Sequence, residues 1–451
     1  MDQTDEKQEM SAKYVYMTQT PVKKLICKLA VPTIVSMLVT GIYNSADTFF
    51  VGKISTEATA AVGIVFSVMA MIQAIGFMCG QGSGTFLSRM LGSHDEKQAN
   101  EVASTGFALS LIIGAVIAVV GIFLVEPLSD MLGATESTLD DTKNYMRIIL
   151  IGAPFMTGQF VINNQLRFQG SAMYAMFGLL AGAAANIILD PILIFVFKLG
   201  VSGAALATVC GQIISFIVLL IGSKQGGNIH IKYKNININK HYIFEIINGG
   251  IPSLFRQGLA ALATIMLNKI AGEYGGDAAI AGMSVATRIL MLVSSALIGF
   301  GQGFQPVSSF NYGANLKKRV REGYFFCLNY GLVFLIFVAG VCFAFAEQIV
   351  SCFRDDPLVI EIGAKALRYQ CISLPMMSGI VITNMMLQSI GAGLKASISS
   401  SARSGIFFIP SILILSSLFG LTGVECSQAV ADFCSLLLSI PFAYSELRKM
   451  R

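Results

Sequence analysis

Two carboxylates interrupt long apolar stretches of this 451-residue chain, and each has a polar neighbour at helical spacing. Asp47 lies in the string YNSADTFFVG and Asp190 lies in NIILDPILIF. Tyr43 precedes Asp47 by four residues and Asn186 precedes Asp190 by four, so each pair shares one face of a helix. Burial and a second nearby carboxylate both favour the protonated form of a carboxyl group. Such a pair could therefore take up a proton, and its hard oxygens also suit Na⁺.

The spacing from the next basic residue places these side chains at similar depths. Asp47 is six residues before Lys53 and Asp190 is eight before Lys198, which is about 9 and about 12 Å along a helix. Thr208 follows Lys198 by about 15 Å, and Tyr145 enters from an acidic connection. We expect one polar layer that senses H⁺ or Na⁺, although the two acids could instead cap bends or pair locally. Its members are Asp47, Asp190, Asn186, Thr208, Tyr43 and Tyr145.

The second half has no matching acids but does carry charge within apolar runs. The candidates for a cavity in this half are Arg256, Arg288, Gln302 and Asp432, with Arg403 nearby. An Arg–Asp pair across helices could be structural or could contact a substrate, and the sequence leaves both readings open. Gln302 is expected to hydrogen-bond between helices, since small residues flank it.

The sequence gives no support for metal binding, enzymatic catalysis or nucleic-acid binding. The nine cysteines include no Cys-x-x-Cys pair, and the three histidines lie far apart, so no metal cluster or cofactor is expected. No nucleophile or spaced catalytic constellation appears, which argues against an enzyme. The net charge of +5 is modest and falls on one side of the predicted spans, so nucleic acid is not an expected partner.

The elements that must hold these residues are membrane-spanning helices. Hydrophobic residues make up 54% of the chain and charged residues only 13%, about half the charge of a soluble domain. Mean hydropathy is +0.69. Apolar runs of about 20 residues predict twelve spans, near 29–52, 58–82, 102–124, 144–166, 172–197, 203–222, 243–271, 279–305, 323–346, 366–389, 396–419 and 423–445.

The two halves of the chain resemble each other at an offset of about 220 residues. Pro32 corresponds to Pro252, and the string GQG at 80–82 recurs at 301–303. Six spans return the chain to its starting side, so the halves would be parallel repeats with a cleft between them. We predict an N-terminal segment (1–24), a first lobe (25–223), a linker (224–242), a second lobe (243–446) and a tail (447–451).

Charge predicts the orientation. Of the 31 Lys and Arg residues, 20 fall in the termini and in the connections on their side, whereas the opposite connections carry acids such as Glu126, Asp130 and Glu347. Positive residues favour the cytoplasmic side. Both termini are therefore expected in the cytoplasm, and membrane lipid is the expected surrounding.

The motifs resemble those of the multidrug and toxic compound extrusion (MATE) family, and within it the MepA-like bacterial export proteins. The resemblance extends over nearly the whole chain and includes YNSADTFFVG, GQGSGTFLSRMLG, NIILDPILIF and GQGFQPVSSFNYGA. It implies a monomeric transporter of the bacterial cytoplasmic (inner) membrane that exports amphipathic, often cationic compounds in exchange for H⁺ or Na⁺. It also implies that Asp47, Asn186, Asp190 and Thr208 hold the ion and that the first helix bends at Pro32.

Other functional classes fit less well. A flippase for lipid-linked precursors would share this topology, but it would favour a strongly basic cavity. A porter of the major facilitator type would carry a basic loop motif after the second span, where this chain has SRMLGSHDEKQA. Some branches of the MATE family have acids in the second lobe, where the seventh span of this chain has Arg256. The substrates and the choice between H⁺ and Na⁺ stay open.

Overall fold

The computed structural model describes residues 12–226, 229 and 231–450, with the side chains at 42–48 and 226 outside that description. Within these residues the structure is helical and has no strand. A short helix covers residues 12–19. The first half then contains α2 (Val22–Val51), α3 (Thr56–Gly92), α4 (Glu96–Phe123), α5 (Val125–Met131), α6 (Leu139–Phe168), α7 (Ala172–Pro191), the π-helix η1 (Ile192–Val196) and α8 (Gly200–Gly226).

The second half follows the short helix η2 (Tyr233–Asn235) and repeats this pattern. It contains α9 (Lys240–Gly313), α10 (Lys317–Ala344), α11 (Ala346–Ser351), α12 (Pro357–Ser373), α13 (Met376–Ser389), α14 (Gly393–Ser401), the π-helix η3 (Ala402–Ile406), α15 (Phe408–Phe419) and α16 (Leu421–Arg448).

Each of the twelve expected spans corresponds to a helix or to a broken helix. Within the described residues, nine helices are long and apolar enough to cross a bilayer, or ten when the bent pair α12–α13 counts as one span. α9 supplies two spans, because it runs for 74 residues and turns at Gly276 (φ 62°, ψ −158°), a conformation that glycine adopts readily. The 30-residue α2 supplies the first span. The predicted all-α, twelve-helix fold is confirmed.

Prolines lie inside several spans, as the sequence predicts. Pro32 is inside α2, which is one continuous helix from Val22 to Val51. A proline cannot donate to the carbonyl four residues earlier, which here is that of Lys28. Two nearby hydroxyls hydrogen-bond to other carbonyls of the helix: Thr33 Oγ1 donates to the Leu29 carbonyl and Ser36 Oγ to the Pro32 carbonyl, both at 2.9 Å. The bend at Pro32 stays a prediction.

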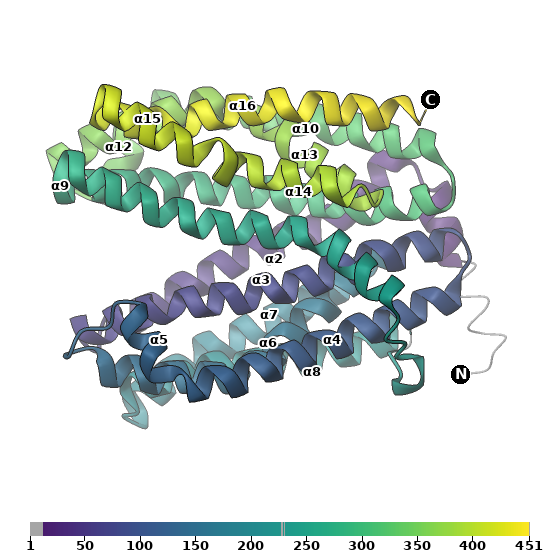
Figure 1. Cartoon of the computed structure of the whole chain (residues 1–451), viewed down its shortest axis with the longest axis horizontal. Helices are drawn as coiled ribbons and strands as arrows, with labels where there is room; N and C mark the ends of the chain where they lie inside the picture. Colours follow the sequence, from purple (N-terminus) through teal and green to yellow (C-terminus); the bar gives the residue numbers. More distant parts are fainter. Residues whose placement is uncertain (1–11, 227–228, 230, 451) are drawn as a thin grey trace.

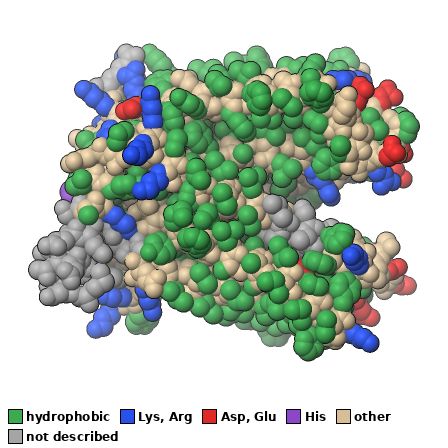
Figure 2. Space-filling view, turned by 180° about the vertical axis from the view of Figure 1, so that it is seen from behind, with side chains coloured by type: hydrophobic (Ala, Val, Ile, Leu, Met, Phe, Trp, Pro, Cys, Tyr) green, Lys and Arg blue, Asp and Glu red, His purple; other side chains and the backbone are tan. Residues whose placement is uncertain are grey.

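The outer surface of the molecule is apolar around its middle. Exposed hydrophobic side chains cover the outward faces of the helices, and examples are Val116 (54%), Phe337 (71%) and Leu437 (54%). Figure 2 shows these side chains spread between two ends where the charges gather. Exposed apolar area of this extent is unstable in water but matches the hydrocarbon interior of a bilayer. The chain is a multi-pass membrane protein.

Two bundles lie side by side and meet closely at one end. Figure 1 shows α2–α8 in one layer and α9–α16 in the other. At the end near α16's C-terminus the backbones of α3 and α9 touch: a Cβ on Gly82 would lie 1.8 Å from the Ile246 carbonyl oxygen. Arg89 of α3 also forms an ion pair with Glu245 of α9 at 2.9 Å. We call this the closed end.

The N-terminal helix (12–19) lies across the closed end and contacts both bundles. In the first bundle, Lys13 Nζ donates to Ser171 Oγ at 3.0 Å, and the Tyr14 ring stacks on His94. In the second bundle, Asn311 Nδ2 donates to the Met17 carbonyl at 3.2 Å, and Arg319 donates to the Thr20 carbonyl at 2.6 Å. The helix therefore joins the two bundles where they already touch.

The opposite end is open. Figure 2 shows a notch between the two bundles at the end where the acidic side chains gather, with basic side chains also present there. Among the described residues, the ion pairs at this end stay within one bundle, as in Lys143–Glu126 of the first and Arg368–Glu347 of the second. The structure is therefore closed where the N-terminal helix lies and open at the far side.

Candidate functional site

Asp190 is the buried carboxylate at the centre of the candidate site. It is the penultimate residue of α7 and has no exposed surface. Pro191 follows it, and the helix continues as the π-helix η1. Single π-turns inside helices are frequent at functional sites, because the extra residue re-aims neighbouring side chains. An acid buried at membrane depth is a functional candidate by default, and the break in the helix beside it supports that assignment.

Asn186 lies one turn before Asp190 and contacts α8. Its Nδ2 donates to Thr208 Oγ1 at 3.4 Å, and both residues are buried. The two helices approach closely here because glycines face each other: a Cβ on Gly211 would lie 2.8 Å from the Gly182 carbonyl oxygen. Asn186 Oδ1 has no hydrogen-bond partner among the described residues. An amide oxygen of this kind is available to a cation.

Tyr145 of α6 belongs to the same region. Its side chain is fully buried in an apolar cluster that also contains Ile194 of η1 and Val209 of α8. Ile194 lies one turn after Asp190, and Val209 is adjacent to Thr208. The structure thus brings α6, α7 and α8 together near Asp190, Asn186 and Thr208, and the shared role of these residues in ion binding stays a prediction.

The two α2 candidates, Asp47 and Tyr43, lie outside the described side chains. α2 packs along α7, and Val51, one turn after Asp47, belongs to the cluster that contains Tyr145. The end of α2 is therefore adjacent to the site. The pairing of Asp47 with Asp190 stays a prediction, as does Na⁺ binding by Asp47, Asn186, Asp190 and Thr208. Among the described residues no three His, Cys, Asp or Glu side chains are grouped to hold a metal.

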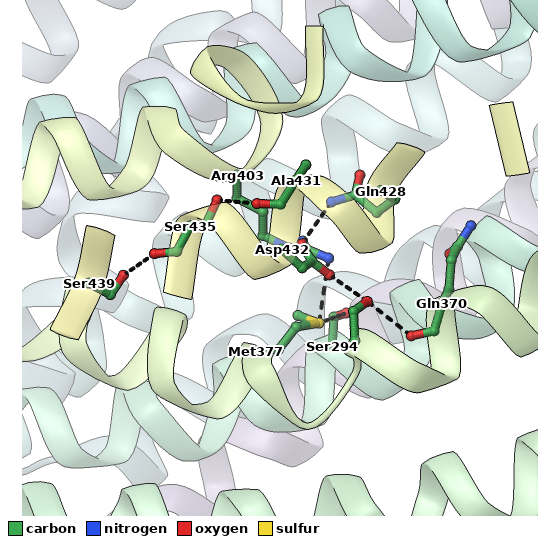
Figure 3. Close-up of polar contacts among 10 residues, drawn as sticks. Ser294, Gln370, Met377, Arg403, Gln428, Ala431, Asp432, Ser435 and Ser439 are labelled. Atoms are coloured by element: carbon green, nitrogen blue, oxygen red, sulfur yellow. Dashed lines mark hydrogen bonds and ion pairs between the residues drawn. The ribbon is translucent and has the colours of Figure 1, made fainter. Parts of the chain in front are cut away.

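In the second bundle Asp432 is neutralised by an arginine. Arg403 Nε lies 2.8 Å from Asp432 Oδ1, and Arg403 comes from η3, the second π-helix. Gln428 Nε2 donates to Asp432 Oδ1 at 2.8 Å and Ser373 Oγ to Oδ2 at 3.1 Å. Figure 3 shows Arg403 and Gln428 beside Asp432. The Arg–Asp pair across helices is present, and a contact of these residues with a substrate stays a prediction.

The remaining candidates of the second half have different surroundings. Gln302 is buried, and its Oε1 accepts a hydrogen bond from Arg167 of α6. Arg256 is half-buried and Arg288 is exposed. Arg167 itself did not stand out in the sequence, because it lies at the end of a span among the basic residues of the connections. Its signal was the polar run NNQ at 163–165, separated from it by one residue, which marks a buried polar face at the end of α6.

Comparisons with known proteins agree with this architecture. The family model described as MatE matches residues 32–192 and 252–414, which together cover more than half of the chain. The chain belongs to the MatE family. It is 29% identical to the multidrug export protein MepA of Staphylococcus aureus over 433 residues, 95% of each chain, and equally to its counterpart in Staphylococcus haemolyticus over 437 residues.

Solved structures of similar transporters have the same fold. One is an outward-facing conformation of a multidrug resistance MATE family transporter, with a TM-score of 0.91, 26% identity, and coverage of 97% of this chain and 98% of that one. Another is a MOP superfamily transporter from Pyrococcus furiosus, with a TM-score of 0.90, 25% identity and the same coverage. The family resemblance in the sequence is therefore confirmed.

Proposed function

We propose that this MatE-family chain is a secondary active exporter, and not an enzyme, that moves amphipathic and cationic compounds out of the cell in exchange for H⁺ or Na⁺. The named relatives at 29% identity are multidrug export proteins, which supports export and does not favour the flippase alternative. We further propose that it acts as a monomer in the bacterial cytoplasmic membrane, with both termini in the cytoplasm.

The observation that carries the proposal is the burial of Asp190 beside a break in its helix. A charged carboxylate at membrane depth is costly unless it is compensated. A proton or Na⁺ arriving from the open end would neutralise Asp190, with Asn186 Oδ1 and Thr208 Oγ1 as further oxygen ligands. The ion-bound and ion-free states of the protein would then differ in how α7 packs against α2 and α8.

Alternating access follows from this difference in packing. An ion shifts a two-state equilibrium only through its different affinity for the two states. A coupling free energy of about 2 kcal/mol suffices for a shift of more than tenfold. In the proposed cycle, ion entry repacks the first bundle, the cleft narrows, the compound leaves through the open end, and the closed end then opens to release the ion.

The test uses dye accumulation in everted membrane vesicles under an imposed proton gradient or an imposed sodium gradient. The unaltered protein should accumulate dye under at least one gradient, which identifies the ion. Asp190→Asn should abolish that accumulation without reducing the amount of protein in the membrane. Asp130→Asn, which alters an exposed acid near the open end, is the matched control and should behave as the unaltered protein. Full activity of Asp190→Asn would remove Asp190 from the mechanism.

A further inference from the structure

A pocket of about 390 Å³ lies at the closed end, where α10 begins and α16 ends. Its lining residues are Lys318, Arg321, Glu322, Phe325 and Met450. The first four are residues of α10 at spacings of three, four and seven from Lys318, so they share one face of that helix. Met450 lies two residues beyond the end of α16. Sites for small ligands have volumes of about 300–1,000 Å³, so the pocket is large enough for a small polar group.

The two cations of this pocket have no ion-pair partner among the described residues. Every ion pair in that part of the chain involves residues other than Lys318 and Arg321. The guanidinium carbon of Arg321 lies 5.7 Å from the centre of the Phe325 ring, a cation–π contact. Glu322 also lines the pocket, so two cations and one acid give it a net charge of +1. The N–H donors of both cations are therefore available to an anion.

The basic residue between these two cations has a different role. Arg319 Nε donates to Asn311 Oδ1 at 2.8 Å, and its Nη2 donates to the Thr20 carbonyl at 2.6 Å. Arg319 therefore holds the N-terminal segment, whereas Lys318 and Arg321 line the pocket. A general excess of positive charge on the cytoplasmic side would not require this division within one run of basic residues.

The face of α10 that forms the pocket continues as an apolar surface. Phe325, Leu332, Val333 and Ile336 are exposed along it, and Asn329 is the polar exception among them. These positions recur at helical spacing and so lie in one strip along the helix. The apolar run that predicts this span begins near residue 323, which places the pocket at the boundary between water and hydrocarbon. A phospholipid has the same order of parts, with a polar headgroup above its acyl chains.

We propose that this pocket binds the phosphate of an anionic phospholipid of the phosphatidylglycerol type, whose acyl chains lie along the apolar strip of α10. Arg321 can donate two parallel N–H groups to phosphate oxygens, and Lys318 adds a compact charge. Basic pockets on the cytoplasmic side of membrane proteins attract anionic headgroups. Arg448, an exposed residue close to Met450 in the chain, adds positive charge and favours an anionic lipid over a zwitterionic one.

The chain contains no tryptophan, so a single introduced tryptophan reports on one place. Phe325→Trp puts this fluorophore at the pocket, and Phe337→Trp puts it on an exposed part of α10 about 18 Å further along the helix. Each full-length protein is reconstituted in vesicles of phosphatidylglycerol and phosphatidylcholine, and one of the two lipids carries brominated acyl chains that quench tryptophan on contact. Exchanging the brominated lipid gives the relative affinity. We expect phosphatidylglycerol to be favoured about tenfold in Phe325→Trp and not at all in Phe337→Trp.

Removal of the pocket cations tests the assignment of the site. Added to Phe325→Trp, Lys318→Gln and Arg321→Gln should each lower the preference about fivefold, the contribution of one basic residue near an anionic membrane surface. Lys24→Gln is the matched control, because it removes an exposed charge of α2 outside the pocket, and it should keep the preference. Equal losses in the three variants would overturn the site, since general surface charge predicts that result. Equal affinity for the two lipids in Phe325→Trp would also overturn it.

Two further measurements identify the ligand. Phosphatidylethanolamine replaces phosphatidylcholine, and an affinity equal to that of phosphatidylglycerol would overturn the requirement for an anionic lipid. Soluble glycerol phosphate, added at constant ionic strength, should leave the quenching unchanged, because the acyl chains also hold the lipid on α10. Loss of the preference on this addition would assign the pocket to a soluble phosphate and overturn the lipid. The proposed export function does not depend on these outcomes, since the pocket lies on the outer face of the second bundle.

Discussion

At the scale of single residues, the Arg403–Asp432 pair makes a stability prediction. Asp432 is 2% exposed and depends on Arg403 for its counter-charge. Arg403→Ala should therefore lower the free energy of unfolding by about 3 kcal/mol, as removal of one partner of a buried pair does. Arg368→Ala breaks the exposed pair with Glu347 and should cost less than about 1 kcal/mol. Thermal unfolding in detergent measures both, and equal losses would contradict the argument.

The contacts and burial of individual side chains could be predicted from the sequence where helical spacing alone brings the groups together. The contact of Asn186 with Thr208 and the burial of Tyr145 follow from apolar periodicity and depth. Arg167 was not predictable, because a basic residue at the end of a span normally reaches water. The polar run at 163–165 marks a buried polar face, but the burial of Arg167 also depends on its contact with Gln302 of the other bundle, which that run does not encode.

At the scale of helices, the close approach of α3 to α9 predicts the effect of a single methyl group. In Gly82→Ala the Cβ would meet the Ile246 carbonyl oxygen at 1.8 Å, so the helices would have to separate at the closed end. We expect a lower unfolding temperature, a cost of about 1–3 kcal/mol, and loss of dye efflux.

The matched control for this change is Gly340→Ala in α10. No atom lies within 4 Å of that Cβ, and alanine favours helix over glycine by about 1 kcal/mol. This variant should be as stable as the original or slightly more so, with unchanged efflux. Unfolding temperature and cellular dye efflux compare the two variants directly. Equal unfolding temperatures and equal dye efflux in the two variants would show that the close contact of α3 with α9 is not needed for stability or transport.

The number of helices was predictable and their interruptions were not. Twelve apolar runs predict twelve spans, since each run is long enough to cross a bilayer. The π-helices η1 and η3 have no comparable signal: Pro191 precedes one of them, but Ala402–Ile406 contains no proline. Such local geometry is set by packing against neighbouring helices. The turn within α9 was expected as a connection, and it is reduced to Gly276 in a nearly continuous helix.

At the scale of the whole molecule, the orientation can be tested with native cysteines. Cys352 is exposed beyond α11 at the open end, and Cys27 is exposed on α2 near the closed end. With both termini in the cytoplasm, a membrane-impermeant maleimide should label Cys352 in intact cells. Cys352→Ser should abolish that labelling. Labelling of Cys352 in everted vesicles but not in intact cells would contradict the predicted orientation.

The helix at residues 12–19 also sets the order in which the molecule can be completed during synthesis. The Met17 carbonyl accepts its hydrogen bond from Asn311, which is 294 positions later in the chain. A nascent protein that has emerged only through its first six spans has no partner for that carbonyl. The first bundle can pack as it leaves the ribosome. The contact of the N-terminal helix with the second bundle can form only after about two thirds of the chain has been translated. Newly made chains therefore pass through a stage in which the membrane contains an unsealed half-transporter.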